Sequence, residues 1–531
     1  MAGKLSTGCR TCVKRRVKCD ETRPACLRCA KGKRTCSGYP AQSIFRHIVF
    51  VGSPSEGYPA QTESTLQEKG HPLPTSTSLQ LRKKPPNGVS EFNYQASVPR
   101  NLSLAGFAND LYCSFLINSY WASSASDDYA ATNRTWFIAC LTKGRAHPTS
   151  YLALQALAMA YFGRKHHQHQ IVFNSSALYG RALRALSGDI QNPDKVRSFD
   201  TLAAVTSLSL FEYCASTTPT AHIRHTSALS HIVELRGPAS FTKYPEKAIL
   251  QTQRILILIQ ALALRKRSFL GNPEWLALHD EDPPDVLPLD PLDAPLTSLV
   301  AIFAILPGVV EDIETIHQQR ISASIGCGTV DKSLFSTTAE SMTSVLSSLH
   351  DWRQTNSSVF SIHCWETPSP GLSCDSNGSI FPTVFWYTSL EAANLVMLYT
   401  ALRLIATEQS HILHNPSYST SIPAYLSAHY CKTQAFEDHL PTVVPLAQTI
   451  MRSVEYHLQP AHTNSGAFYI MFPARLAYMA LRRERRECVW LRRVIEQVAD
   501  QGGLEIAREI LGDDLLEAAR REGGSRMLEL A

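Results

Sequence analysis

The chain has 531 residues, of which 44% are apolar and 18% charged, and its formal net charge is +5. That length indicates more than one domain, and the composition is that of a globular protein able to bury a large core. The N-terminus lacks an apolar signal segment, and no apolar run reaches the roughly 20 residues that cross a bilayer, so we expect neither secretion nor a membrane span.

Six cysteines gather near the N-terminus in a spacing that repeats. The pattern C-x2-C-x6-C is written twice, with an offset of 17 residues. The six are Cys9, Cys12, Cys19, Cys26, Cys29 and Cys36. Two equal halves predict two equivalent metal sites related by a local pseudo-twofold axis.

Counting ligands indicates what these cysteines hold. A structural zinc ion takes four ligands in a tetrahedron, and thiolate is a good one. Two separate all-cysteine sites would need more sulfurs than the motif supplies, and no histidine precedes His47. Two zinc ions are satisfied if two thiolates each bridge both metals. A disulfide knot and a single zinc site are the alternatives, but paired C-x2-C spacing in a long chain favours the two-zinc cluster.

This spacing resembles the Zn₂Cys₆ binuclear cluster of fungal transcription regulators, over about 40 residues. The resemblance implies a DNA-binding module of two short helices over residues 1–40 that holds two Zn²⁺ ions. It also implies that Cys9 and Cys26 are the bridging ligands and that Pro24 lies in the turn between the halves. A nuclear location, double-stranded DNA and the transcription machinery follow as expected partners.

Positive charge is concentrated in the same module. Residues 1–40 hold 11 Lys or Arg and only 2 acids, whereas residues 41–531 carry a net charge of −4. Between Cys12 and Cys19 four of six residues are cationic, and Val13 and Val17 would share the inner face of a short helix fixed by the metal. This distribution is the electrostatic footprint of a phosphate binder.

The cations of this helix are the predicted DNA contacts. Arg and Lys can meet guanine N7 and O6 in the major groove. By resemblance, the end of the helix lies over a short G·C-rich triplet, typically CGG, and Arg16 occupies the position that reads guanine. Lys14, Arg15 and Lys18 are predicted phosphate or secondary contacts, and the second basic group at 31–34 is expected to contact phosphate or to serve nuclear import.

Residues 41–103 are rich in Pro and Ser and predict a flexible linker. The prolines interrupt any sustained heptad repeat, so no coiled coil is expected after the cluster. Homodimerisation, if it occurs, would then use the large C-terminal domain, and binding to a single site stays open. The basic run at 82–86 is either an import signal or a solvated charge cluster.

Residues 104–531 show helical periodicity and predict a large all-α regulatory domain of antiparallel helix pairs. The expected helices are 105–121, 149–163, 171–187, 199–215, 222–236, 246–266, 297–320, 334–355, 385–409, 437–458, 467–483, 486–500 and 504–521. One of them, His222–Pro238, resembles the H-x3-A-x3-I/L-x2-RG pattern in the middle region of fungal zinc-cluster regulators.

The motifs of nucleotide-binding loops, zinc proteases and serine hydrolases are absent from the sequence, so we expect no enzymatic activity. The predicted function is a sequence-specific regulator of RNA polymerase II transcription, controlling a metabolic or biosynthetic gene set. Two alternatives are a zinc-tethered enzyme with an unrecognised helical catalytic domain and a ligand-binding sensor. The sensor is compatible with a regulator, since a helical domain can house an effector pocket.

Overall fold

The computed structural model describes residues 10–15, 17, 19–20, 26–32, 36, 107–120, 134–144, 147–218, 220–279, 291–371, 374–375, 378–415, 434–481 and 485–511. The chain divides into two compact units, Met1–Ser97 and Val98–Ala531. The linker predicted over 41–103 and the basic run at 82–86 lie outside the described residues.

The N-terminal unit contains two helices of five residues each, α1 (Arg10–Lys14) and α2 (Leu27–Lys31). Their starts and ends are offset by the same 17 residues that separate the two cysteine runs. Each helix carries a cysteine at its third position, Cys12 in α1 and Cys29 in α2. The sequence repeat is therefore a structural repeat, and the predicted module of two short helices is confirmed.

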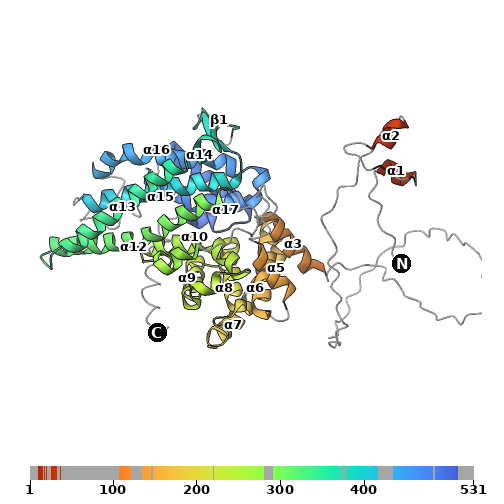
Figure 1. Cartoon of the computed structure of the whole chain (residues 1–531), viewed down its shortest axis with the longest axis horizontal. Helices are drawn as coiled ribbons and strands as arrows, with labels where there is room; N and C mark the ends of the chain where they lie inside the picture. The colour runs from red at the N-terminus through yellow and green to blue at the C-terminus, as the bar shows by residue number, and fades with distance from the viewer. Residues whose placement is uncertain are drawn as a thin grey trace, which may run out of the picture. The chain divides into compact units, whose positions relative to one another are not determined.

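The C-terminal unit is built mainly of long helices (Figure 1). In chain order the first group is α3 (Ala108–Tyr120), α5 (Thr135–Thr142), α6 (Pro148–Lys165), α7 (His169–Ile190), α8 (Phe199–Ala215), α9 (Ala221–Arg236) and α10 (Glu246–Leu264). The second group is α12 (Asp293–Ser324), α13 (Lys332–Thr355), α15 (Leu390–His414), α16 (Gln434–His457), α17 (Thr463–Ala480) and α18 (Arg486–Gly502). Three shorter helices are α11 (Pro273–Leu276), α14 (Ser357–Ser361) and α19 (Ala507–Ile510).

Helix ends follow from local chemistry. Ser198 caps the start of α8, where its side chain accepts a hydrogen bond from the Thr201 amide. Asp331 caps the start of α13, where its carboxylate accepts hydrogen bonds from the amides of Ser333 and Leu334. Gly237, with φ of 74°, ends α9 in a conformation that suits glycine. The Arg-Gly pair that closes the H-x3-A-x3-I/L-x2-RG pattern therefore coincides with the end of α9.

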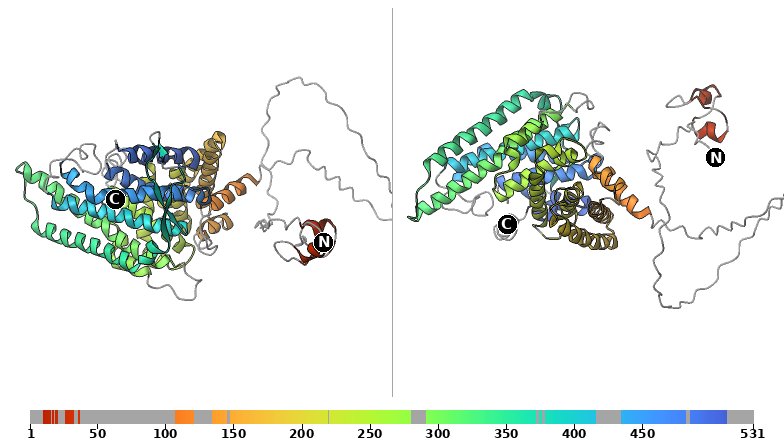
Figure 2. Two further views of the ribbon diagram at one scale, coloured as in Figure 1. Left: turned by 90° about the horizontal axis from the view of Figure 1, so that it is seen from above. Right: turned by 60° about the horizontal axis from the view of Figure 1, so that its bottom comes forward.

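Consecutive helices pack as neighbours, as expected for antiparallel pairs joined by short connections. α6 packs against α7 and α8, α12 against α13, and α16 against both α15 and α17. Figure 2 shows α12 and α13 running side by side to one end of the domain. The buried side chains of the helical domain form one continuous core. Its largest fully buried members include Trp136, Tyr161 and Tyr478.

The apolar runs at 255–264 and 299–310 lie within α10 and α12. By length and composition alone, α10, α12 and α15 are long and apolar enough to cross a membrane. In the fold, 56% of the apolar window of α10 and of α12, and 72% of that of α15, is buried inside the domain. Their apolar character is therefore used for internal packing.

A small antiparallel hairpin departs from the all-helical expectation. β1 (Cys364–Pro368) pairs with β4 (Thr383–Tyr387), and a second pair, β2 (Cys374–Asp375) with β3 (Gly378–Ser379), lies between them in sequence. The helix expected from residue 385 is wrong at its start, since α15 begins at Leu390 after a Ser389 cap. β-Branched and aromatic residues in β4 favour a strand, and this strand packs on α16 through the Tyr387 hydroxyl, 2.6 Å from Ser453 Oγ.

Candidate metal centre and DNA-binding helix

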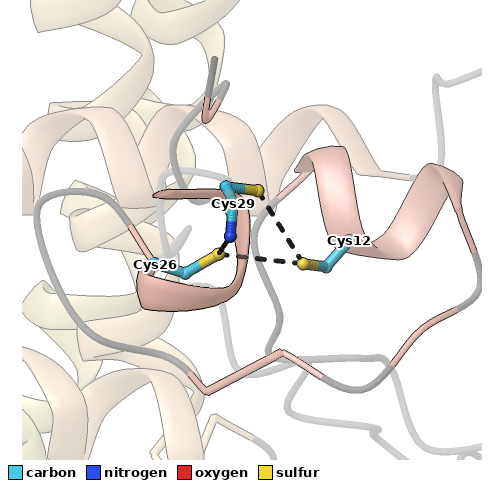
Figure 3. A group of neighbouring side chains, drawn as sticks. All are labelled: Cys12, Cys26 and Cys29. Atoms are coloured by element: carbon cyan, nitrogen blue, oxygen red, sulfur yellow. Dashed lines mark hydrogen bonds between the residues drawn. The ribbon is translucent and has the colours of Figure 1, made fainter. Parts of the chain in front are cut away.

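Three of the six motif cysteines bring their sulfurs together in the N-terminal unit (Figure 3). Cys12 Sγ lies 3.7 Å from Cys26 Sγ and 3.9 Å from Cys29 Sγ. Cys12 comes from α1, Cys29 from α2, and Cys26 directly precedes α2. All three are buried, so residues from both halves of the repeat converge on one point.

The separations between these sulfurs fit a metal–thiolate cluster. A zinc–sulfur bond of about 2.3 Å in a tetrahedron places neighbouring sulfurs about 3.8 Å apart. A disulfide would require about 2.05 Å. None of the described motif cysteines, from Cys12 to Cys36, forms a disulfide. The donor set is therefore that of a structural zinc cluster rather than a disulfide knot.

The remaining motif cysteines extend this group. Cys19 and Cys36 are partly buried and pack against the three buried thiols. The structure thus gathers five of the six predicted ligands, while Cys9 lies outside the described residues. Cys12 is close to both Cys26 and Cys29, so these distances do not single out Cys26 as a bridging sulfur. The assignment of the bridging role to Cys9 and Cys26 stays a proposal.

Two polar interactions shape the second half around the sulfurs. The carboxylate of Asp20 accepts hydrogen bonds from the amides of Leu27 at 3.0 Å and Arg28 at 2.6 Å, the first two residues of α2. The amide of Cys29 donates to Cys26 Sγ at 3.3 Å, which favours the thiolate form of that sulfur. Asp20 therefore caps α2 from the other half of the module and joins the two halves.

Sequence reasoning missed Asp20. A helix cap is usually sought immediately before the helix, whereas Asp20 precedes α2 by seven residues. The sequence does show that Asp20 directly follows Cys19, so its carboxylate must lie near the cysteine cluster. Only the folded loop brings the carboxylate to the start of α2.

The cations at the end of α1 are presented to solvent. Lys14 and Arg15 are exposed, and Arg15 N donates to Thr11 O at 3.2 Å, which continues the helical turn. Val17 packs against the cysteine group, as the predicted inner face requires. Arg16 and Lys18 lie outside the described residues. A buried sulfur cluster thus anchors a short helix whose exposed end is cationic.

Comparison with known families identifies the module. Residues 7–43 match the Fungal Zn(2)-Cys(6) binuclear cluster domain, a type of domain that binds two zinc ions. The N-terminal module is therefore a two-zinc cluster domain, and the predicted cofactor is confirmed. The family consists of transcription regulators rather than enzymes, in agreement with the predicted lack of enzymatic activity.

Three curated relatives show how far the similarity reaches. An uncharacterized protein of Emericella nidulans is 31% identical over 129 residues, which cover 24% of this chain and 28% of that protein. Transcriptional regulatory protein moc3 of Schizosaccharomyces pombe is 47% identical over 53 residues, 10% of each chain. The aspercryptin biosynthesis cluster-specific transcription regulator atnN of Emericella nidulans is 57% identical over 37 residues, 7% of this chain and 6% of that protein.

These matches span less than a third of the relatives' own lengths. No solved structure is significantly similar to the chain. The similarity therefore establishes the zinc-cluster domain.

Proposed function

Because the chain is a protein of the fungal Zn(2)-Cys(6) cluster type, we propose that it is a sequence-specific, DNA-binding regulator of RNA polymerase II transcription that acts in the nucleus. The observation that carries the proposal is the exposed, cationic end of α1, held by buried cysteines from both halves of the module. A rigid helix with exposed cations suits the major groove of DNA.

The metal organises this surface. The six cysteine thiolates would hold two zinc ions with four sulfur ligands each if Cys9 and Cys26 were shared by both ions. The metal–sulfur bonds hold α1 and α2, each of which is far too short to persist alone in water. A closed, all-sulfur site leaves no open position for substrate, so its role is structural.

The proposed target is a G·C-rich site that contains CGG. Arg16 directly follows Lys14, the last residue of α1, and Arg15, and its guanidinium fork matches guanine O6 and N7. Lys14, Arg15 and Lys18 contact phosphates beside it. The regulated genes are metabolic or biosynthetic, a proposal supported by the similarity of the zinc-cluster module to the aspercryptin biosynthesis cluster-specific regulator atnN.

Arg16→Ala in the full-length protein tests the proposed reader. We expect loss of about 1–3 kcal/mol of discrimination between a CGG duplex and a shuffled duplex of the same composition, because only a base-edge contact distinguishes them. Equilibrium titration of both duplexes at one fixed salt concentration measures this. Equal loss of affinity for both duplexes would instead make Arg16 a phosphate contact.

Lys33→Ala is the matched control. Position 33 follows position 16 by the 17 residues of the repeat, so it occupies the equivalent place in the other half. We expect this change to weaken both duplexes alike and to leave their ratio unchanged, as loss of a phosphate contact does. Selection from random duplexes with the wild-type protein should return CGG, and a collection of sites without a shared sequence would contradict sequence-specific binding.

A further inference from the structure

The helical domain contains a cavity of about 290 Å³. Its walls come from α8, α9, α10, α12, α15 and α17, so helices from both halves of the domain enclose it. Most lining side chains are apolar, among them Leu210, Ile259, Val310, Leu398, Phe472 and Met479. The cavity lies wholly within one unit and does not involve the zinc-cluster module.

This volume approaches that of small-molecule sites, which begin at about 300 Å³. Close-packed interiors otherwise leave few voids larger than a water molecule. One water needs roughly 10–15 Å³ of such volume and two to four polar partners, which a wall made mainly of carbon does not supply for so many waters. The space therefore suits an organic molecule better than solvent.

Glu408 supplies a polar group inside this apolar space. The residue is 6% exposed and lines the cavity from α15, and its carboxyl has no hydrogen-bond partner among the described residues. Burial raises the pKa of Glu408 to about 8, so the side chain is a neutral carboxylic acid at neutral pH. In that form it can both donate and accept a hydrogen bond.

Gln409, 3% exposed, lines the cavity beside it and adds an amide donor and acceptor. The charged lining groups do not favour an anionic ligand. Asp293 and Glu391 are acidic, whereas Arg475 is the cation and donates to the carbonyl oxygen of Ile510. The walls are thus mainly apolar, and Glu408 and Gln409 are two of the neutral hydrogen-bonding groups among them, with Gln253 and Gln260 on α10 as others.

We propose that this cavity binds a neutral, largely apolar small molecule whose hydroxyl or carbonyl group hydrogen-bonds to Glu408 and Gln409. The lining residues all belong to the helical domain, and the proposal does not depend on which DNA sequence the zinc cluster reads. A neutral ligand avoids the cost of placing a charge among apolar side chains, and its polar group satisfies a buried carboxyl that the described residues leave without a partner.

The probe for the test is prodan, a neutral naphthalene fluorophore with one ketone oxygen whose emission moves to the blue in apolar surroundings. Titration into the full-length, zinc-loaded protein is expected to give saturable one-to-one binding and blue-shifted emission. Leu398→Trp places a large ring in the cavity and should abolish the saturable signal. If that variant fails to fold, Ala263→Phe fills the same cavity from α10.

Two further variants test the polar contact. Glu408→Gln keeps a neutral donor and should bind prodan within about threefold of wild type, whereas Glu408→Leu should bind about tenfold more weakly, the loss expected for one hydrogen bond. Glu340→Leu, a change at an exposed glutamate on α13, is the matched control and should leave binding unchanged.

Three results would overturn the proposal. The first is the absence of saturable prodan binding to the folded wild type. The second is undiminished binding to a folded cavity-filling variant, which would place the probe elsewhere. The third is tighter binding of the anionic probe 1-anilinonaphthalene-8-sulfonate than of prodan at this site, which would contradict a preference for neutral ligands.

Discussion

Glu408 shows how burial sets the chemistry of a single residue. Its carboxyl is buried among apolar side chains of the helical core, and burial raises its pKa from an ordinary 4.5 to about 8. The charged groups that share the cavity, Asp293, Glu391 and Arg475, do not offset this effect. The folded protein therefore keeps a proton that the unfolded chain releases at lower pH.

Glu408→Gln should change how stability depends on pH. Between pH 4.5 and 8 the unfolded carboxyl is ionised while the folded one is not, so wild type loses stability relative to the variant as pH rises through this window. From about pH 5.5 to 7.5 the difference in free energy of unfolding should shift by about 2.5 kcal/mol in favour of the variant. Urea denaturation at both pH values measures it, and parallel behaviour of the two proteins would show that the carboxyl is not buried in this way.

Residue roles that depend on spacing along the chain could be predicted from the sequence, whereas roles that depend on the folded surroundings could not. Cysteine spacing alone indicated the ligand set, and the structure brings Cys12, Cys26 and Cys29 together. The roles of Asp20 and Glu408 could not be predicted. One caps a helix seven residues away, and the other acquires its raised pKa only when several helices enclose it.

At the element scale, Gly466 lets two helices meet. It lies in the second turn of α17, where a Cβ would overlap the carbonyl oxygen of His457 at the end of α16. The ring of His457 is fully buried and hydrogen-bonds to Ser453 O and to the side chain of Asn394, so this end of α16 has little room to move. Close approach of the two backbones therefore requires glycine.

Gly466→Ala should lower the free energy of unfolding by about 2–3 kcal/mol, the cost of overpacking a well-filled core. Gly188→Ala is the matched control because Gly188 is an exposed helical glycine on α7 with no neighbour within 4 Å of an added Cβ. That change should stabilise by about 0.5–1 kcal/mol. Thermal or urea unfolding compares the two, and similar effects in both variants would contradict the close approach.

Elements were predictable to different degrees. Helices with strong periodicity, such as α8 and α9, match their predicted ranges closely. The hairpin β1–β4 was missed because Val384–Tyr387 is as apolar as the helix it precedes, and a short apolar run does not distinguish strand from helix. Pairing with β1 and packing on α16 make it a strand, and both are tertiary effects.

At the scale of the whole molecule, the two units have separate sources of stability. The N-terminal module depends on metal–thiolate bonds, since α1 and α2 are five residues each. The helical domain has its own continuous apolar core. The chain divides into the units Met1–Ser97 and Val98–Ala531, and the boundaries predicted from composition at 40/41 and 103/104 stay predictions.

Removal of zinc should therefore unfold one unit and spare the other. A strong chelator is expected to abolish the ordered structure of residues 9–36 while the far-ultraviolet circular dichroism of the helical domain stays nearly unchanged. Without metal, each half of the module has only a five-residue helix, which is too short to persist alone. The apolar core of the helical domain contains none of the motif cysteines and so does not depend on the metal.

Binding of the zinc-loaded full-length chain to a CGG duplex, before and after chelation, tests the central claim most directly. Fluorescence anisotropy at fixed salt should show binding at least about 10³-fold tighter to the CGG duplex than to a shuffled one. We predict that chelation removes this preference and that added Zn²⁺ restores it. Metal-free protein that still prefers the CGG duplex would contradict the account.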